Sequence, residues 1–358
     1  MINNNNTMAG SIESFLVFIW FLTSGLKILF VNIIYFDDFE ITQAFVSSLF
    51  WGVGCFIIIR GFLSLKYWSY TFLISCLILL SFSILNIGLI TFVFAVIVWC
   101  AISNILNEEK FRRVYLFSLF LLIVLVLLSV LFFGQIYYFD ARYGNVPSFG
   151  FANSNSFPQL LVVFLLIAAN HFRLSLLYSV SLLFFAYIGI KTRSFYLIMI
   201  VYPFMFLLMR FIKTRLVIFV PIILFVSSII LVEYSNTDWG ITVDQLLSFR
   251  LRLSYQLLGY LEPYQWVIGS SYKPDFPMDM SYINLVFSFG IISAILMVSL
   301  YTILLYRLYI QDNYRLIAFV LCFLLYAFVE NVFINYYLNP TLYYAFFYGI
   351  KFNKKIIT

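Results

Sequence analysis

The chain has 358 residues, of which 64% are hydrophobic and only 10% are charged, and its net charge is +6. Soluble domains carry about 25% charged residues, so the composition excludes a water-soluble protein and indicates one that lies in a membrane. The positive charge is therefore interpreted as the distribution of Lys and Arg between the two sides of a bilayer. We expect no nucleic-acid partner.

Apolar segments of spanning length follow one another along most of the chain. A helix that crosses a bilayer needs about 20 mostly apolar residues, and on that length the sequence predicts an all-α, polytopic transmembrane protein with about 12 spans. The predicted spans are 12–34, 41–59, 69–86, 88–104, 115–134, 156–170, 174–190, 194–210, 216–234, 281–306, 316–334 and 340–351. They predict a single integral membrane domain over residues 1–358. The N-terminus has no basic region before its first apolar segment, so we expect that segment to remain as a span.

The distribution of cations gives the orientation of the spans. With the N-terminus in the cytoplasm, the inner loops hold 14 of the 21 Lys and Arg residues and the outer loops hold six. This bias agrees with the positive-inside rule, and an even number of spans keeps it at both ends. We therefore expect both termini to be cytoplasmic. The large loop 235–280, between the ninth and tenth spans, and a second loop, 135–155, then lie outside.

Several kinds of site are not indicated by the sequence. The four cysteines form no C-x-x-C pair, so neither a disulfide framework nor a zinc site is expected. The only histidine, His171, falls in an inner turn, which excludes a Ser-His-Asp arrangement or a histidine metal cluster on the outer face. No phosphate-binding loop or dinucleotide fingerprint is present. We expect neither a metal nor a cofactor.

The six cations of the outer loops are the first candidates for chemistry because they run against the insertion bias. They are Arg142, Lys191, Arg193, Arg250, Arg252 and Lys273. A guanidinium group binds phosphate oxygens through a planar fork and keeps its charge at physiological pH. Several of them beside a bilayer suit an anionic lipid headgroup, above all a diphosphate. The alternative is that a few outer cations are simply tolerated.

Acidic residues on the outer side are the second group of candidates. Asp279 lies just before a predicted span, where it can act as a general base toward a sugar hydroxyl, or else be an ordinary solvated carboxylate. Glu330 lies near the outer end of its span, and an intramembrane carboxylate is costly enough to suggest a function. An ion pair between Glu330 and Lys27 is the structural alternative. Asp37 and Asp38 form a pair in a short outer turn that suits either a metal or solvent.

Taken in their order along the chain, the motifs of the predicted outer face resemble those of the O-antigen polymerase family (Wzy-type), within the O-antigen polymerase and ligase superfamily. The similar segments are Arg142 with 150–155, the turn 191–194, the stretch 250–270, the segment 279–292 and the pair 330–331. Two features depart from the family pattern. Ligases of the superfamily usually have a histidine near the position of Asp279, which is missing here, and Met280 with Ser281 stands where an Asn is usual.

The resemblance implies a glycosyltransferase that joins undecaprenyl diphosphate-linked repeat units on the outer face of the bacterial inner membrane. It implies that Arg193, Arg250 and Arg252 bind the diphosphate, with help from Arg142 and Lys191. Asp279 is then the first candidate for the base and Glu330 the second. A chain-length regulator is an implied protein partner.

Three alternatives remain open from the sequence. The first is a lipid-linked oligosaccharide flippase, although transporters usually show internal repeats and charges near the bilayer midplane. The second is an O-antigen ligase. The third is another polytopic glycosyltransferase that uses Asp37 and Asp38.

Overall fold

The computed structural model describes part of the chain and divides it into two compact units. The described residues are 4–33, 40–63, 87–140, 144–151, 153–172, 192–211, 214–272, 274, 276 and 278–350. The first unit comprises Met1–Leu65 and Ala101–Pro203, and the second comprises Lys66–Cys100 and Phe204–Thr358. Each unit is described by itself. The expectation of a single membrane domain over residues 1–358 stays a prediction.

The described part of the chain is almost entirely helical, and it contains six helices long and apolar enough to cross a membrane. These are Ser11–Phe30, Glu40–Gly61, Glu108–Phe133, Arg193–Phe211, Arg215–Asn236 and Ser281–Ile310. At 1.5 Å per residue, each is close to the thickness of a hydrocarbon core or longer. The all-α membrane fold is therefore confirmed in its coarse form. The predicted spans 69–86 and 174–190 lie outside the described residues, and each other predicted span coincides with a helical segment.

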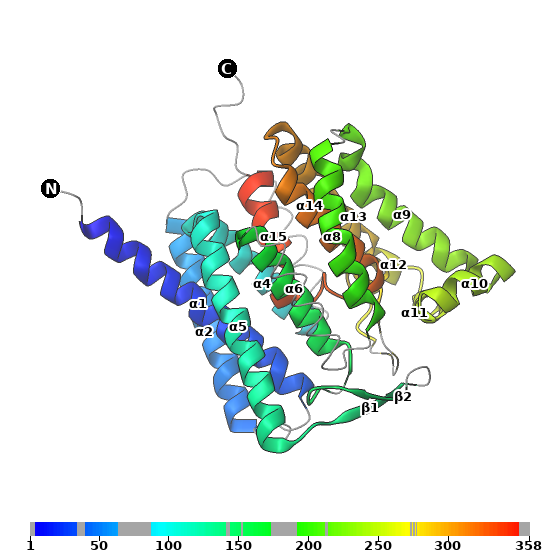
Figure 1. Ribbon diagram of the computed structural model, residues 1–358, viewed down its shortest axis with the longest axis horizontal. Coiled ribbons are helices and arrows are strands. Elements are labelled where there is room, and N and C mark those ends of the chain that lie inside the picture. Colours follow the sequence, from blue (N-terminus) through cyan, green and yellow to red (C-terminus); the bar gives the residue numbers. More distant parts are fainter. Residues whose placement is uncertain are drawn as a thin grey trace. The chain divides into compact units, whose positions relative to one another are not determined.

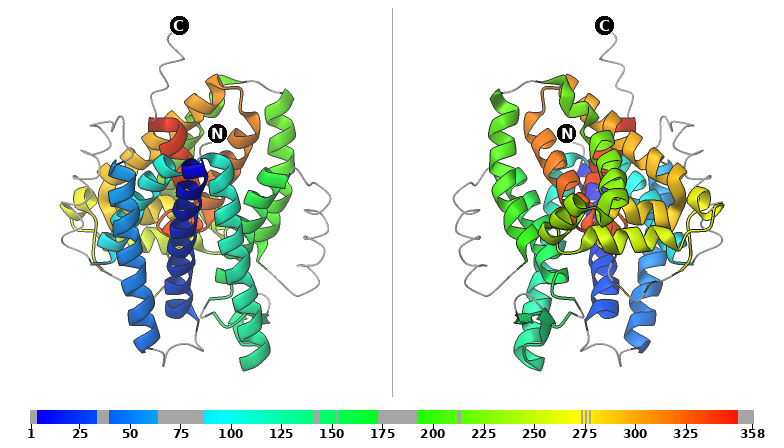
Figure 2. Two further views of the ribbon diagram at one scale, coloured as in Figure 1. Left: turned by 90° about the vertical axis from the view of Figure 1, so that its left-hand side faces the viewer. Right: turned by 90° about the vertical axis from the view of Figure 1, so that its right-hand side faces the viewer.

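The first unit is built around a group of long helices. These are α1 (Asn4–Asn32), α2 (Glu40–Leu63), α5 (Glu108–Phe133) and α6 (Ser156–Phe172), followed by the start of α8 (Arg193–Phe211). Helix α1 packs against both α2 and α5, and the three lie side by side in Figures 1 and 2. The fully buried aromatic side chains Trp20, Phe21 and Tyr115 fill the space between them.

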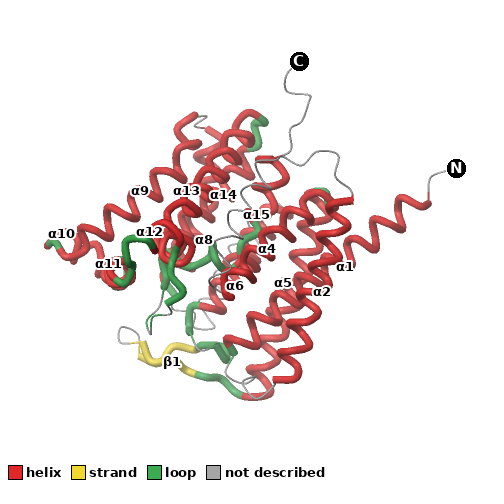
Figure 3. The backbone as a smooth tube through the Cα atoms, turned by 180° about the vertical axis from the view of Figure 1, so that it is seen from behind, coloured by secondary structure: helices red, strands yellow, loops and turns green. Residues whose placement is uncertain are grey.

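A short antiparallel hairpin interrupts the helical pattern of the first unit. Strand β1 (Tyr137–Asp140) pairs with β2 (Gly144–Pro147) in the predicted outer loop 135–155, and the hairpin is drawn in yellow in Figure 3. The all-α prediction did not include it. Its run of three aromatic residues, Tyr137, Tyr138 and Phe139, favours a strand, because aromatic residues are enriched in strands.

The second unit is organised around α13 (Ser281–Ile310). Its other described elements are most of α4 (Ile87–Ile105), η2 (Arg215–Phe219), α9 (Val220–Glu233), η3 (Tyr234–Asn236), α10 (Asp238–Leu246), α11 (Arg250–Gly259), α12 (Gln265–Ile268), α14 (Tyr314–Val329), η4 (Tyr336–Leu338), α15 (Thr341–Tyr344) and the π-helical turn Ala345–Ile350. Helix α13 contacts α9, α11, α12 and α14. Helix α14 is buried on nearly all sides, as the side chains of 316–324 show. It is the core helix of this unit.

A cluster of apolar side chains fixes the helices of the loop 235–280 to the neighbouring candidate spans. Its buried members are Val232, Leu251, Leu257, Leu261, Met280, Ile283 and Phe287. They come from α9, α11 and α13, except for Leu261, which follows α11, and Met280, which directly precedes α13. Burying one Leu or Ile side chain contributes about 1.5–3 kcal/mol. The loop 235–280 is thus a packed structure, and α11 has a defined place beside α13.

Helix α12 meets α13 backbone to backbone at two glycines. Gly290 lies inside α13 with φ 79° and ψ 168°, a conformation that kinks the helix. A Cβ there would collide with the carbonyl of Val267, and one on Gly269 would collide with the carbonyl of Ser288. The amide of Ser270 donates to the carbonyl of Phe287 at 2.7 Å. Only glycines allow this approach, which anchors the segment between α11 and α13.

Candidate functional site

The turn between α10 and α11 places Arg250 as the first residue of α11. Ser248 and Phe249 both have positive φ, at 64° and 65°, which is strained for residues with a side chain. The buried Asp244 stabilises the turn because its Oδ1 accepts hydrogen bonds from the amides of Leu251 (2.8 Å) and Arg252 (3.3 Å). Asp244 thereby satisfies amides that the start of α11 leaves without helical partners.

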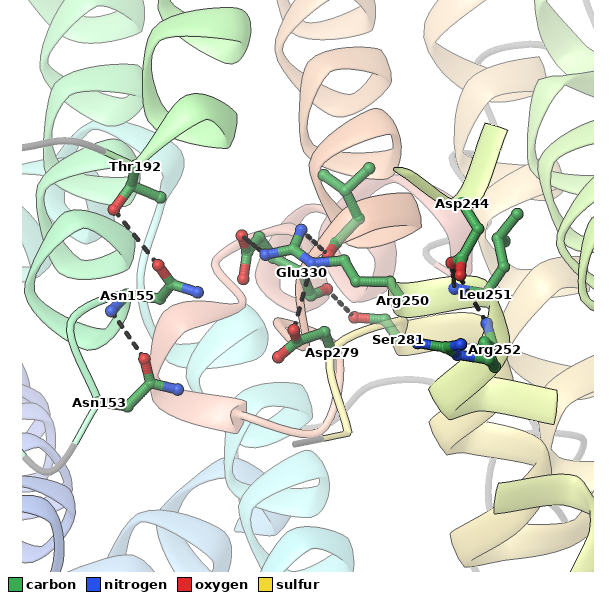
Figure 4. A network of polar contacts seen from close by, with 11 residues as sticks. Asn153, Asn155, Thr192, Asp244, Arg250, Leu251, Arg252, Asp279, Ser281 and Glu330 are labelled. Carbon is green, nitrogen blue, oxygen red and sulfur yellow. Dashed lines mark hydrogen bonds and ion pairs between the residues drawn. The ribbon is translucent and has the colours of Figure 1, made fainter. Parts of the chain in front are cut away.

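The guanidinium of Arg250 lies between two carboxylates (Figure 4). Its Nη2 is 2.7 Å from Oε1 of Glu330, and its Nε is 3.2 Å from Oδ2 of Asp279. Its Nη1 donates to the carbonyl of Val329. The exposed fractions of the side chains are 11% for Arg250, 19% for Asp279 and 0% for Glu330. The three residues lie at the start of α11, just before α13 and just after α14, so the fold brings them together from distant points in the sequence.

The hydroxyl of Ser281 fixes the chain where it leaves α14. Its Oγ donates to the carbonyl of Glu330 at 2.6 Å (Figure 4). The same oxygen accepts from the amide of Val332 at 2.8 Å. The amide of Glu330 still donates to the carbonyl of Tyr326, but Glu330 itself is extended, with φ −127° and ψ 150°. The helix therefore ends at Val329, and the side chain of Glu330 is directed at Arg250.

The electrostatics of the cluster explain why a buried arginine is tolerated. Burial by itself lowers the pKa of Arg250, but the nearby carboxylates of Glu330 and Asp279 outweigh it and hold that pKa above its ordinary value. Arg250 is thus charged at every physiological pH, and its charge is matched locally. We interpret Arg250 as the group that positions the two carboxylates, because its donors are directed at protein acceptors.

Arg252 has a different environment although it lies only two residues further along α11. Its side chain is exposed, and the guanidinium carbon lies 5.4 Å from the centroid of the Phe249 ring. A cation over the face of an aromatic ring is attracted by the ring. Of the two arginines predicted to bind a diphosphate in this loop, Arg252 is the one with an exposed side chain.

The first unit brings two other predicted motifs together. Thr192 Oγ1 donates to Oδ1 of Asn155 at 3.3 Å, and the amide of Asn155 donates to Oδ1 of Asn153 at 2.8 Å (Figure 4). Arg193 follows as the first residue of α8, with an exposed side chain. Arg142 and Lys191 lie outside the described residues. Asn155 and Thr192, which come from two of the predicted motifs, are therefore neighbours, a contact that the sequence alone does not reveal.

The sequence nominated three members of the ionic cluster, Arg250, Asp279 and Glu330, but it missed the residues that support them. Asp244 and Ser281 carry no motif that distinguishes them from other loop residues. Tyr326 has a fainter signal, since it precedes Glu330 by one helical turn. Its fully buried hydroxyl has no hydrogen-bond partner in the described part of the chain, and it is close enough to Glu330 to interact with it electrostatically.

The environment of Glu330 also bears on the alternative of a pair with Lys27. In the structure, Arg250 is an ionic partner of Glu330. The ammonium of Lys27 instead lies 4.7 Å from the centroid of the Phe50 ring and 5.6 Å from that of Trp51, all within the first unit. The pair between Lys27 and Glu330 stays an untested alternative, because the two residues belong to different units.

Metal ligands do not gather in the described residues, where no group of three or more His, Cys, Asp or Glu side chains is placed to hold an ion. The expectation of metal independence stays a prediction. Comparison of the chain with protein-family models, curated proteins and solved structures gave no match. Any functional interpretation therefore depends on the residues and their geometry.

Proposed function

We propose that the chain is a polysaccharide polymerase, a glycosyltransferase that joins undecaprenyl diphosphate-linked repeat units. The observation that carries the proposal is the meeting of Arg250, Asp279 and Glu330 beside the exposed Arg252. Transfer from a lipid diphosphate needs a cation for the leaving group and a carboxylate for the acceptor proton. This part of the second unit offers both, within a packed loop that joins two candidate spans.

The proposal includes an orientation in the membrane. The chain has about twelve spans in the bacterial inner membrane, with both termini in the cytoplasm. The loop 235–280, and with it α10, α11 and α12, then lies on the outer face. The ionic cluster is reached from outside through Asp279, which keeps 19% of its side chain exposed while Glu330 keeps none.

The residues divide the chemistry as follows. An acceptor hydroxyl attacks the anomeric carbon of the growing glycan, whose bond to the lipid diphosphate breaks. Asp279 accepts the hydroxyl proton, since it is the more accessible of the two carboxylates. Arg252 binds the departing lipid diphosphate and stabilises its negative charge. Arg250 holds Asp279 in place through their ion pair, and Glu330 in turn fixes the guanidinium of Arg250.

Residues of the first unit keep the roles that the sequence gave them. Arg193 is exposed at the start of α8 and is proposed, with Arg142 and Lys191, to bind a lipid-linked headgroup. A chain-length regulator is a proposed partner. The reaction is proposed to need no metal, because the cations of the protein supply the charge that a metal would otherwise provide.

The deciding experiment is deletion of the gene in its host, followed by separation of the surface glycolipids on a gel. Loss of long chains with a remaining single-repeat band supports a polymerase, because export and ligation then still work. Polymer that accumulates on its lipid carrier outside indicates a ligase. Single units trapped inside indicate a flippase.

Point variants then test the proposed roles in the deletion strain. Arg252→Ala is expected to shorten the polymer at normal protein levels, while Gln256→Ala, which changes another exposed residue of α11, is expected to leave chain length unchanged. Asp279→Asn keeps the shape of the side chain and removes the base. Full-length polymer from the Asp279→Asn variant would refute the assignment of the base.

A further inference from the structure

Helix α9 carries an exposed apolar stripe that identifies its lipid-facing side. The exposed fractions are 55% for Ile223, 46% for Val226, 49% for Ile230 and 54% for Tyr234. These residues recur every three or four positions, so they lie on one face of the helix. The segment Arg215–Asn236 is also one of the candidate spans. The stripe therefore faces hydrocarbon and ends at Tyr234, an aromatic residue typical of the membrane interface.

Helix α10 begins directly after this stripe. Thr237 caps its start by accepting from the amide of Gly240, and α10 leads away from the end of α9 in Figure 1. A Cβ on Gly240 would collide with the carbonyl of Tyr234, so the backbone of α10 is pressed against the end of the span. The position of α10 relative to the lipid-facing stripe is thereby fixed, and α10 has to emerge close to the bilayer surface.

Helix α10 presents two large apolar side chains on one of its faces. Trp239 and Leu246 lie seven residues apart and therefore share that face, with exposed fractions of 59% and 71%. Asp244 points inward, to cap α11. Large apolar side chains in water are unfavourable by about 25 cal/mol for each Å² exposed. A helix with Trp and Leu on one face and polar residues on the other is typical of segments that lie in a membrane interface.

We propose that α10 lies flat in the interface of the leaflet that surrounds the outer end of α9. Trp239 and Leu246 then enter the boundary between headgroups and acyl chains, and the lipid surface continues without a break from α9 to α10. The neighbouring Arg252 is thereby held at the level of the lipid phosphates. A second protein copy and a glycan are the other occupants that this face could have. The position of α10 directly after the lipid-facing stripe of α9 favours lipid over both.

The test places a nitroxide spin label on α10 of the full chain in lipid nanodiscs. Leu246→Cys is labelled in a background with Cys55→Ser and Cys76→Ser, since Cys55 is exposed and Cys100 and Cys322 are buried. The control is Glu262→Cys, an exposed charged position before α12. Collisions with oxygen, which partitions into lipid, are compared with collisions with a water-soluble nickel chelate. The ratio is expected to be at least about threefold higher at 246 than at 262.

Two results would overturn the proposal. Equal ratios at the two positions would show that α10 faces water or a soluble glycan. Protection from both oxygen and nickel would show that another protein copy covers it. Repeating the measurement with Trp239→Cys guards against a local effect of one label. None of these outcomes depends on polymerase activity.

Discussion

The two polar sites of the molecule differ in how they are held. In the second unit, Arg250 is buried and binds two carboxylates from other segments, so its geometry is set by the packing of α11, α13 and α14. In the first unit, Asn155 and Thr192 meet through one partly exposed hydrogen bond. Both sites were nominated from the sequence by the same kind of argument, that polar and charged residues gather in outer loops. The difference teaches that the Arg250 cluster is a rigid support, whereas the contact between Asn155 and Thr192 can be rearranged with little loss of stability.

The largest expected effect follows from removing the cation of the buried site. Arg250→Ala leaves the carboxylates of Asp279 and Glu330 without their shared partner, which should destabilise the protein by about 3–5 kcal/mol. The measurement is thermal unfolding of the purified protein in detergent. A variant with Arg250→Met, Asp279→Asn and Glu330→Gln should regain most of the loss because it buries no charge. A melting temperature for Arg250→Ala equal to that of the native chain would show that the cluster is not held as described.

The second prediction separates backbone strain from packing. Gly134 and Gly290 have almost the same conformation, with φ and ψ of 88° and 169° against 79° and 168°. A Cβ meets nothing within 4 Å at Gly134, but it meets the carbonyl of Val267 at Gly290. Gly134→Ala should therefore cost only the strain of its conformation, about 1–3 kcal/mol.

Gly290→Ala should cost the same strain and also displace α12 from α13. We expect a clearly lower melting temperature than for Gly134→Ala, and faster proteolysis within the loop 260–280. If the two variants melt together and the loop stays protected, then the contact between α12 and α13 contributes little to the support of the outer loop.

Composition and the length of the apolar segments were enough to predict the helical membrane fold, because lipid requires long apolar helices whatever their tertiary arrangement. The pattern also nominated Arg250, Asp279 and Glu330, since costly charges near span ends are few. It did not predict that they pair, because pairing depends on the strained turn at Ser248 and Phe249 and on the break of α14. Because Arg250 and Arg252 lie close together in the same predicted loop, the sequence suggested the same role for both.

The structure gives Arg250 and Arg252 different environments for a physical reason. On a helix, residues two apart point in different directions, and the cap formed by Asp244 fixes which of them faces the core. No local motif marks Asp244 as a cap, because its contact with the amide of Leu251 spans seven residues. The span edges show the same limit, since α14 ends at Val329 although the predicted span runs to residue 334.

The third prediction concerns this cap. Asp244→Ala should destabilise the protein by about 1–2 kcal/mol, since the amides at the start of α11 lose their acceptor inside the structure. Asp244→Asn retains an acceptor oxygen and should lose less. Asp238→Ala, at an exposed position of the same helix, is the matched control and should change the melting temperature little. Equal melting temperatures for Asp244→Ala and Asp238→Ala would contradict the capping role and leave the position of Arg250 unexplained.

The smallest effect is expected at the polar site of the first unit. Thr192→Val keeps the shape of the side chain and removes the hydroxyl that donates to Asn155. Because this bond is long and partly exposed to solvent, the loss should be about 0.5 kcal/mol, which is near the lower end for a hydrogen bond. Ser281→Ala removes a hydroxyl with both a donor and an acceptor role in the buried site, and it should cost several times more. Thermal unfolding of the two variants side by side tests the contrast directly. If Thr192→Val proved as damaging as Ser281→Ala, the first unit would hold a site as rigid as the second, because a bond that can be remodelled does not transmit such a loss.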